Sequence, residues 1–202
     1  MKNRSHARGP GSFELSRGIW ATWWYTVSAV LLFELFFVTA WAGAWGTAEG
    51  RNDVDPVVLA AGAVWFAGTV WLLLAYRRRE ERGPLLPRRD IPALLICVAA
   101  GIAMLVLTGS WLAGAAFVLQ PISILNWQRG VRLRVVGTVT AVLVALAVID
   151  RAQSSVELDP AAWAVGMAFS IALPAATVTS LWWWDVLVAF DKARAVESRL
   201  AA

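Results

Sequence analysis

The sequence predicts an all-α, multi-pass membrane protein with about six transmembrane helices. Of its 202 residues, 59% are hydrophobic and only 16% are charged, which is too apolar for a soluble domain of this size. The apolar residues gather in runs close to the about 20 residues that cross roughly 30 Å of hydrocarbon. No alternating strand pattern competes with these runs, and helices satisfy their own backbone hydrogen bonds in lipid.

The first predicted span follows a polar and basic N-terminal arm, residues 1–19. A basic arm before an apolar run is also typical of a signal peptide. The run at 20–45, however, is much longer than the roughly 7 to 15 residues of a signal core, so we expect an uncleaved helix. The second predicted span covers residues 57–76.

The third apolar tract, residues 91–127, is too long for one span, because a single helix of this length would measure about 55 Å. We expect it to fold back at residues 108–110 and to form two short spans. A re-entrant hairpin with both ends on one side is the alternative. The fifth span is expected at 131–149 and the sixth at 161–184, so that the membrane domain covers residues 20–184.

The distribution of basic residues predicts the orientation of these helices. With the N-terminus inside, sixteen of the eighteen Lys and Arg residues fall in inner segments, and only Arg51 and Arg151 fall in outer loops. Positive charge accumulates on the cytoplasmic side of membrane proteins, so we expect both termini in the cytoplasm. The arginine-rich segment 76–90 acts as a topology determinant in this interpretation and can also attract anionic headgroups. Nucleic acid is not an expected partner.

Tryptophans and small residues suggest how the helices meet lipid and each other. Twelve of the thirteen tryptophans lie near predicted helix ends, as in interfacial belts. Trp65 lies in mid-span, where belt anchoring is preferred over an aromatic cage for a quaternary ammonium ligand. Small residues four apart allow close helix packing. These pairs are Ala63 and Ala67, Ala99 and Ala103, and Ser110 and Gly114.

Few polar side chains interrupt the predicted spans, and these are candidate sensing residues. Glu34 lies near the middle of the first span, where a carboxylate costs about 2.5 to 3.5 kcal/mol on insertion scales and must face other helices. It has either a proton-linked or sensing role, or the simpler role of a neutral carboxyl bonded to a neighbouring helix. At Gln120-Pro121 the proline frees a carbonyl one turn earlier, which predicts a kink or a small polar pocket. Pro174 is likewise a candidate hinge or a tolerated kink.

The sequence offers no catalytic or metal-binding pattern. The only histidine, His6, lies in the basic arm, and the only cysteine, Cys97, lies inside an apolar run. There is no P-loop, GxGxxG, GxSxG or HExxH motif. No catalytic residue, metal ligand or cofactor is therefore expected in this chain.

Beyond the sixth span, residues 185–202 continue without Gly or Pro and predict the start of a cytoplasmic transmission or dimerisation helix. Its apolar residues are spaced three, four, three and four, as in the a/d seam of a coiled coil. We call them the transmission seam: Val186, Ala189, Ala193, Val196 and Leu200. Two heptads are too short for a stable coiled coil alone, so we expect a longer pairing helix and a homodimer.

The same tail resembles the junction in DesK-type sensor histidine kinases of actinobacteria, where the last membrane helix continues into the dimerisation helix. The resembling residues are Asp191, Lys192, Ala193, Arg194, Glu197, Arg199 and Leu200. The resemblance implies the sensor and signal-transmission module of a two-component kinase in a bacterial plasma membrane. In that family a phosphoacceptor histidine and an ATP-binding domain follow. ATP, Mg and a response regulator are therefore expected only through such a kinase region.

A complete small membrane protein is the alternative: a transporter or channel subunit that uses Glu34 and Gln120, or an accessory subunit of a larger complex. An intramembrane enzyme is disfavoured because no polar constellation suits one. Outer loops of about a dozen residues are too short for an extracellular ligand-binding domain. The stimulus of a sensor is therefore expected to act within the bilayer or next to it.

Overall fold

The computed structural model describes residues 10–48, 56–79, 84–108, 111–153 and 160–200. These residues form six α-helices and one short 3-10 helix, with no strand among them, so the predicted all-α class is confirmed. The elements in order are α1 (Pro10–Ala48), α2 (Pro56–Arg77), η1 (Arg88–Asp90), α3 (Ile91–Thr108), α4 (Trp111–Ser123), α5 (Arg129–Gln153) and α6 (Pro160–Leu200).

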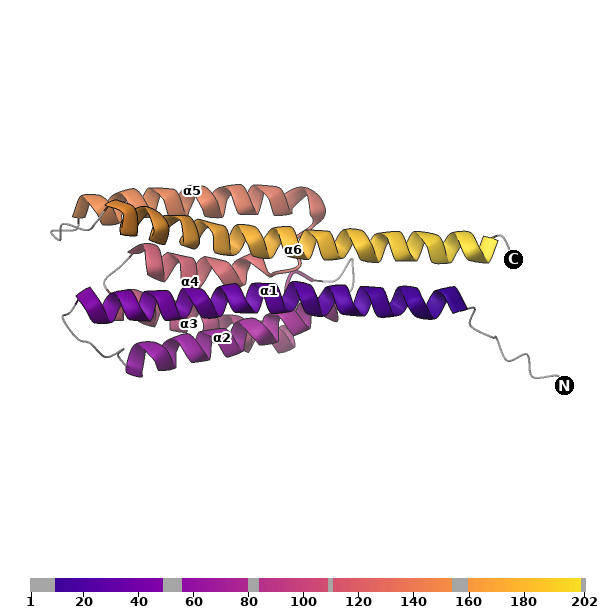
Figure 1. Ribbon diagram of the computed structural model, residues 1–202, viewed down its shortest axis with the longest axis horizontal. Helices are drawn as coiled ribbons and strands as arrows, with labels where there is room; N and C mark the ends of the chain where they lie inside the picture. Colours follow the sequence, from indigo (N-terminus) through magenta and orange to yellow (C-terminus); the bar gives the residue numbers. More distant parts are fainter. Residues whose placement is uncertain (1–9, 49–55, 80–83, 109–110, 154–159, 201–202) are drawn as a thin grey trace.

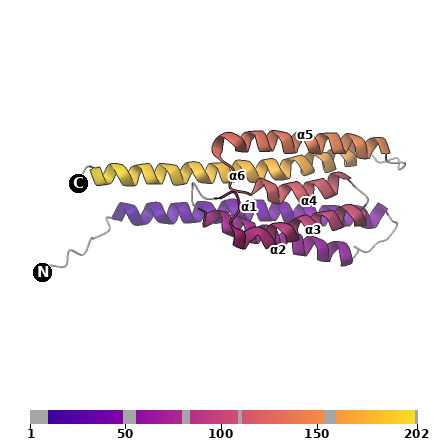
Figure 2. The same cartoon turned by 180° about the vertical axis from the view of Figure 1, so that it is seen from behind.

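The six helices run alternately in opposite directions in one bundle (Figure 1). α1 and α6 pack side by side, and both project beyond the other helices at the same end of the bundle (Figures 1 and 2). We call this end, where α1 begins and α6 finishes, the terminal end. Trp23 and Trp184 meet there, with ring centroids 4.9 Å apart. Both tryptophans are buried between helices, so the belt interpretation is wrong for these two.

Five of the helices are long and apolar enough to cross a membrane, among the residues that the structure describes. They support a multi-pass membrane protein. α4 differs from them, because its 13 residues extend about 20 Å, less than the hydrocarbon thickness. The tract 91–127 folds back as expected: α3 ends at Thr108 and α4 begins at Trp111. Gly109 and Ser110, the centre of the predicted turn, lie outside the described residues.

The start of α4 is held by a residue of another helix. The backbone N–H groups of Trp111 and Leu112 each donate a hydrogen bond, both 2.9 Å long, to the carboxylate oxygens of Asp150 on α5. The first N–H groups of a helix have no partner within the helix, and negative charge is favourable at that end. Asp150 therefore fixes α4 to α5 at the end of the bundle opposite the terminal end.

Glycines, rather than the predicted alanine pairs, bring the helices close together. A Cβ atom added at Gly114 on α4 would lie 2.4 Å from the Cβ of Leu105 on α3. One added at Gly68 on α2 would lie 2.5 Å from the sulfur of Cys97 on α3. Gly114 packs tightly, while its predicted partner Ser110 lies outside the described residues. The alanines Ala63, Ala67 and Ala99 are exposed and make no such contact with the described residues.

α1 and α6 both extend beyond the apolar runs that predicted them. α1 begins at Pro10, ten residues before the first apolar run, so part of the basic arm is helical. α6 is one helix of 41 residues, about 60 Å long, and it continues past the predicted span as expected. Pro121 and Pro174 both lie inside helices rather than at their ends.

Candidate functional site

A buried polar cluster joins three helices near the middle of the bundle. The side-chain amide of Gln120 on α4 donates one hydrogen bond of 2.8 Å to Glu34 on α1 and one of 2.7 Å to the hydroxyl of Thr177 on α6. All three side chains are fully buried, with 0% exposure. The hydroxyl of Thr177 donates in turn to the carbonyl of Leu173 at 3.0 Å. We call Glu34, Gln120 and Thr177 the polar cluster.

The polar cluster contains buried acceptors that nothing in the described residues satisfies. Oε2 of Glu34 and Oε1 of Gln120 are both buried and receive no hydrogen bond there. An unsatisfied buried polar atom costs about 1 to 3 kcal/mol. Such atoms are uncommon in native proteins, so each one calls for an explanation, such as an ordered water, strain or a functional role. The cluster can therefore accept a further donor, or rearrange, with less loss than a fully paired network.

The proline next to Gln120 creates a second polar contact. Pro121 has no N–H, so the carbonyl of Phe117, four residues earlier, loses its helical partner. The indole N–H of Trp65 on α2 donates to this carbonyl at 2.7 Å, and the two rings meet edge to face at 4.8 Å. Trp65 is fully buried, so neither belt anchoring nor an aromatic cage describes it. The expected polar pocket is instead filled by Trp65.

Pro174 lies one turn before Thr177 on α6 and is buried. It removes the helical hydrogen bond to the carbonyl of Ser170. The interruption therefore lies immediately beside the polar cluster. Its position suits the predicted hinge, and hinge motion remains a prediction.

A second cluster, made of charged residues, joins three helices at the terminal end. Asp185 on α6 accepts hydrogen bonds from Arg132 on α5 at 2.6 Å, from the Tyr76 hydroxyl on α2 at 3.0 Å, and from Arg79 just after α2. Arg132 also donates to the Tyr76 hydroxyl at 2.6 Å, and Arg79 donates to Asn126. We call Asp185, Arg79, Arg132 and Tyr76 the charge clamp.

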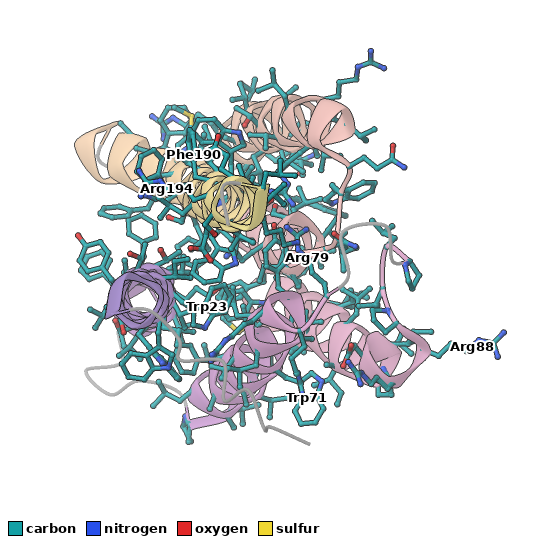
Figure 3. The ribbon with its side chains drawn as sticks, turned by 90° about the vertical axis from the view of Figure 1, so that its right-hand side faces the viewer. Trp23, Trp71, Arg79, Arg88, Phe190 and Arg194 are labelled. Carbon is teal, nitrogen blue, oxygen red and sulfur yellow. The ribbon has the colours of Figure 1, made fainter. Side chains whose placement is uncertain are left out.

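The charge clamp is shielded from solvent. Arg132 is only 4% exposed, and the guanidinium of Arg79 lies 3.7 Å from the centre of the Tyr76 ring. Figure 3 shows Arg79 turned toward the middle of the bundle, whereas Arg88 projects outward. A charge pair with so little water is strongly coupled, and loss of one partner leaves an uncompensated charge. The charge clamp therefore fixes α6 to α2 and α5 at the residue that follows the three consecutive tryptophans of α6.

Beyond the charge clamp, the transmission seam emerges from the bundle. Val186 and Ala189 are partly buried, whereas Ala193, Val196 and Leu200 are exposed, Val196 by 54% and Leu200 by 83%. Val196 and Leu200 thus form an apolar stripe that no other described residue covers. The tail residues Asp191, Lys192, Arg194 and Glu197 lie on the same helix; the side chain of Arg199 is outside the described set.

Glu34 and Gln120, both candidate sensing residues from the sequence, are hydrogen-bonded to each other in the structure. The structure also adds residues that the sequence interpretation missed. Thr177 was missed because threonine in a membrane helix commonly bonds its own backbone. The charge clamp was missed because Arg79 and Arg132 were interpreted only as topology determinants. The available signal was Asp185, an acid directly after Trp184. Such an acid is costly at the hydrocarbon boundary unless a cation faces it.

Among the described residues, no group of His, Cys, Asp and Glu could hold a metal ion. Comparison of the chain with protein-family models, with curated proteins and with solved structures found no match.

Proposed function

We propose that this protein is a membrane sensor and signal-transmission module with α6 as its output. The module lies in a bacterial plasma membrane with both termini in the cytoplasm, and it works as a homodimer. A change in the bilayer alters how α1, α4 and α6 fit together, and α6 conveys the change to the transmission seam. The proposal extends the resemblance of the tail to DesK-type sensor kinases.

The observation that carries this proposal is the path of α6. One helix, α6, takes part in the polar cluster through Thr177 and in the charge clamp through Asp185, and then presents an exposed apolar seam. A helix that served only to span the membrane would not need to project so far beyond its bundle (Figure 2). Both clusters thus touch the same helix that continues into the transmission seam.

The short helix α4 suggests how the bilayer acts on the module. Helices respond to hydrocarbon thickness by tilting or shifting. α4 extends only about 20 Å and is fixed at its first residues by Asp150, so a change of thickness acts unequally on α4 and on its longer neighbours. Gln120 lies near its other end and bridges Glu34 to Thr177. The polar cluster is therefore the element whose alternative hydrogen bonding would distinguish two states.

The output in this proposal is a histidine kinase region that follows α6 and supplies the enzymatic step. Such a region brings its own phosphoacceptor histidine, ATP, Mg and response regulator. In this proposal the residues described here detect the stimulus and transmit it to that region.

A transporter or channel subunit is the second candidate. The two unsatisfied acceptors of the polar cluster favour it, because an intramembrane acid with spare acceptors is typical of ion and proton pathways. We put the sensor first because α6 connects both clusters to the exposed transmission seam, an arrangement that a transporter subunit does not require.

The proposal is tested by fusing residues 1–200 to the dimerisation helix and catalytic domain of a reporter histidine kinase. The fusion keeps the heptad register of the transmission seam, and a series of variants carries one to seven residues inserted after Leu200. Each inserted residue rotates the seam by about 100° relative to the kinase.

Kinase activity in cells is expected to rise and fall with the inserted length, and to return when seven residues restore the register. A matched series inserts the same residues in the kinase lacking residues 1–200. Activity that ignores the inserted length in the membrane fusion would refute the proposal.

A further inference from the structure

A half-open groove lies between α1 and α6 at the terminal end, separate from the polar cluster and the charge clamp. Its volume is about 270 Å³, and its walls are Ile19 from α1 with Leu187, Phe190, Asp191 and Arg194 from α6. Phe190 is 63% exposed, far more than a phenylalanine packed in a protein interior. Figure 3 shows Phe190 and Arg194 projecting from one side of α6.

The groove and the transmission seam occupy different faces of α6. At about 100° per residue, the directions of the four groove residues of α6 and of the five seam residues are centred about 130° apart. A second copy paired along the seam would therefore leave the groove uncovered. The occupant of the groove has to be sought elsewhere.

The position of the groove along α6 matches the headgroup layer. Phe190 and Arg194 lie about 8 to 14 Å beyond Asp185, the first charged residue of α6. On α1, exposed Trp20 and Trp24 lie within two turns of Ile19, and tryptophan rings favour the interfacial layer. Lipid headgroups are thus the molecules that surround the groove at the highest concentration.

The polar residues of the groove have opposite charge and lie one turn apart. Arg194 offers a planar guanidinium, which suits a phosphate, and Asp191 offers a carboxylate, which suits an ammonium group that carries hydrogen-bond donors. Ile19, Leu187 and Phe190 supply an apolar wall for the first methylene groups of an acyl chain. This set is complementary to a headgroup that carries both a phosphate and a primary amine.

We propose that the groove between α1 and α6 is a binding site for a phospholipid with an ethanolamine headgroup. Its phosphate pairs with Arg194 and its primary ammonium with Asp191. A glycerol headgroup has no cation for Asp191, and a choline headgroup has no N–H to donate, so both bind less well. The site stands on this geometry alone. Its consequence, that a lipid between α1 and α6 biases the output helix, rests on the proposed function.

The site is tested on the full chain, purified in detergent, by native mass spectrometry after addition of phosphatidylethanolamine, phosphatidylglycerol or phosphatidylcholine with the same acyl chains. The variants are Arg194→Ala and Asp191→Asn, both at the surface of α6. Arg134→Ala, an exposed arginine on α5, is the matched control.

Phosphatidylethanolamine is expected to remain bound in preference to the other two lipids. Arg194→Ala should lower its bound fraction about fivefold, the order expected for one partly exposed charge-assisted contact. Asp191→Asn should remove the preference for ethanolamine, and Arg134→Ala should change neither.

Equal retention of the three lipids by the unmodified chain would overturn the site, as would equal losses in Arg194→Ala and Arg134→Ala. If a second copy occupied the groove, the chain would appear as a dimer that binds no lipid until Arg194 or Asp191 is changed. This result would also overturn the lipid site. The readout contains no signalling step, so failure of the lipid site and failure of the proposed function are distinguishable.

Discussion

Replacing Asp185 by asparagine tests the charge clamp. The substitution keeps the size of the side chain and removes the negative charge that faces Arg79 and Arg132. Arg132 is 4% exposed and donates a 2.6 Å hydrogen bond to Asp185. In the variant its charge remains buried without an opposite partner.

The size of the effect follows from this burial. Loss of one partner of a fully buried pair costs about 3 to 5 kcal/mol. Asp185 and Arg79 keep some solvent contact, at 10% and 17% exposure, and asparagine can still accept one hydrogen bond. We therefore expect Asp185→Asn to lower the free energy of unfolding by about 2 to 3 kcal/mol, or roughly 30- to 150-fold in the folding equilibrium.

The assay is SDS-induced unfolding of the purified chain in mixed micelles, followed by circular dichroism. Glu197→Gln, an exposed acid on the same helix, is the control and should stay within about 0.5 kcal/mol of the unmodified chain. A double variant, Asp185→Leu with Arg132→Leu, should recover part of the loss because no charge stays buried at position 132, while the more exposed Arg79 still lacks its acid. A loss below about 0.5 kcal/mol in Asp185→Asn, or no recovery in the double variant, would refute this reasoning.

Three further predictions use the same unfolding assay. Gln120→Leu removes the only hydrogen-bond donor that the structure gives Glu34 and should cost about 1 to 3 kcal/mol; an unchanged stability would contradict the geometry of the polar cluster. Gly114→Ala should lower the free energy of unfolding by about 1 to 3 kcal/mol because the added Cβ would meet Leu105. The control Gly137→Ala, with nothing within 4 Å of the added Cβ, should be neutral or stabilising, and similar effects at the two sites would be evidence against the α3–α4 contact. Trp65→Phe should cost about 1 to 3 kcal/mol, and less in a Pro121→Ala background, whose new N–H can satisfy the Phe117 carbonyl; an equal cost in both backgrounds would count against the contact.

The helices were predictable because the membrane imposes one pattern on all of them. The runs of apolar residues gave six segments that correspond one to one with α1 to α6, since a span of about 20 apolar residues is a strong signal. The fold-back within the tract 91–127 followed from the length of that tract. The continuation of α6 followed from the absence of Gly or Pro after Trp184.

The side-chain partners were predictable only in part. Glu34 and Gln120 stood out because polar residues are costly in hydrocarbon, and the structure joins them. Which third residue would complete the cluster depended on the rotation of α6, which one sequence does not reveal. Arg132 shows the limit most clearly: the same arginine that favours a cytoplasmic loop also pairs with Asp185, and composition does not separate the two roles.

The most direct measurement of transmission through α6 uses spin labels at Ala193, introduced as cysteine in a Cys97→Ala background. Double electron–electron resonance then gives the distance between the labels of two copies, in bilayers of thinner and of thicker lipids. Because α6 links the polar cluster to the transmission seam, the distance distribution should differ between the two bilayers, and Gln120→Leu should remove the difference. Identical distributions in the two bilayers, or a difference that survives Gln120→Leu, would contradict transmission from the polar cluster through α6.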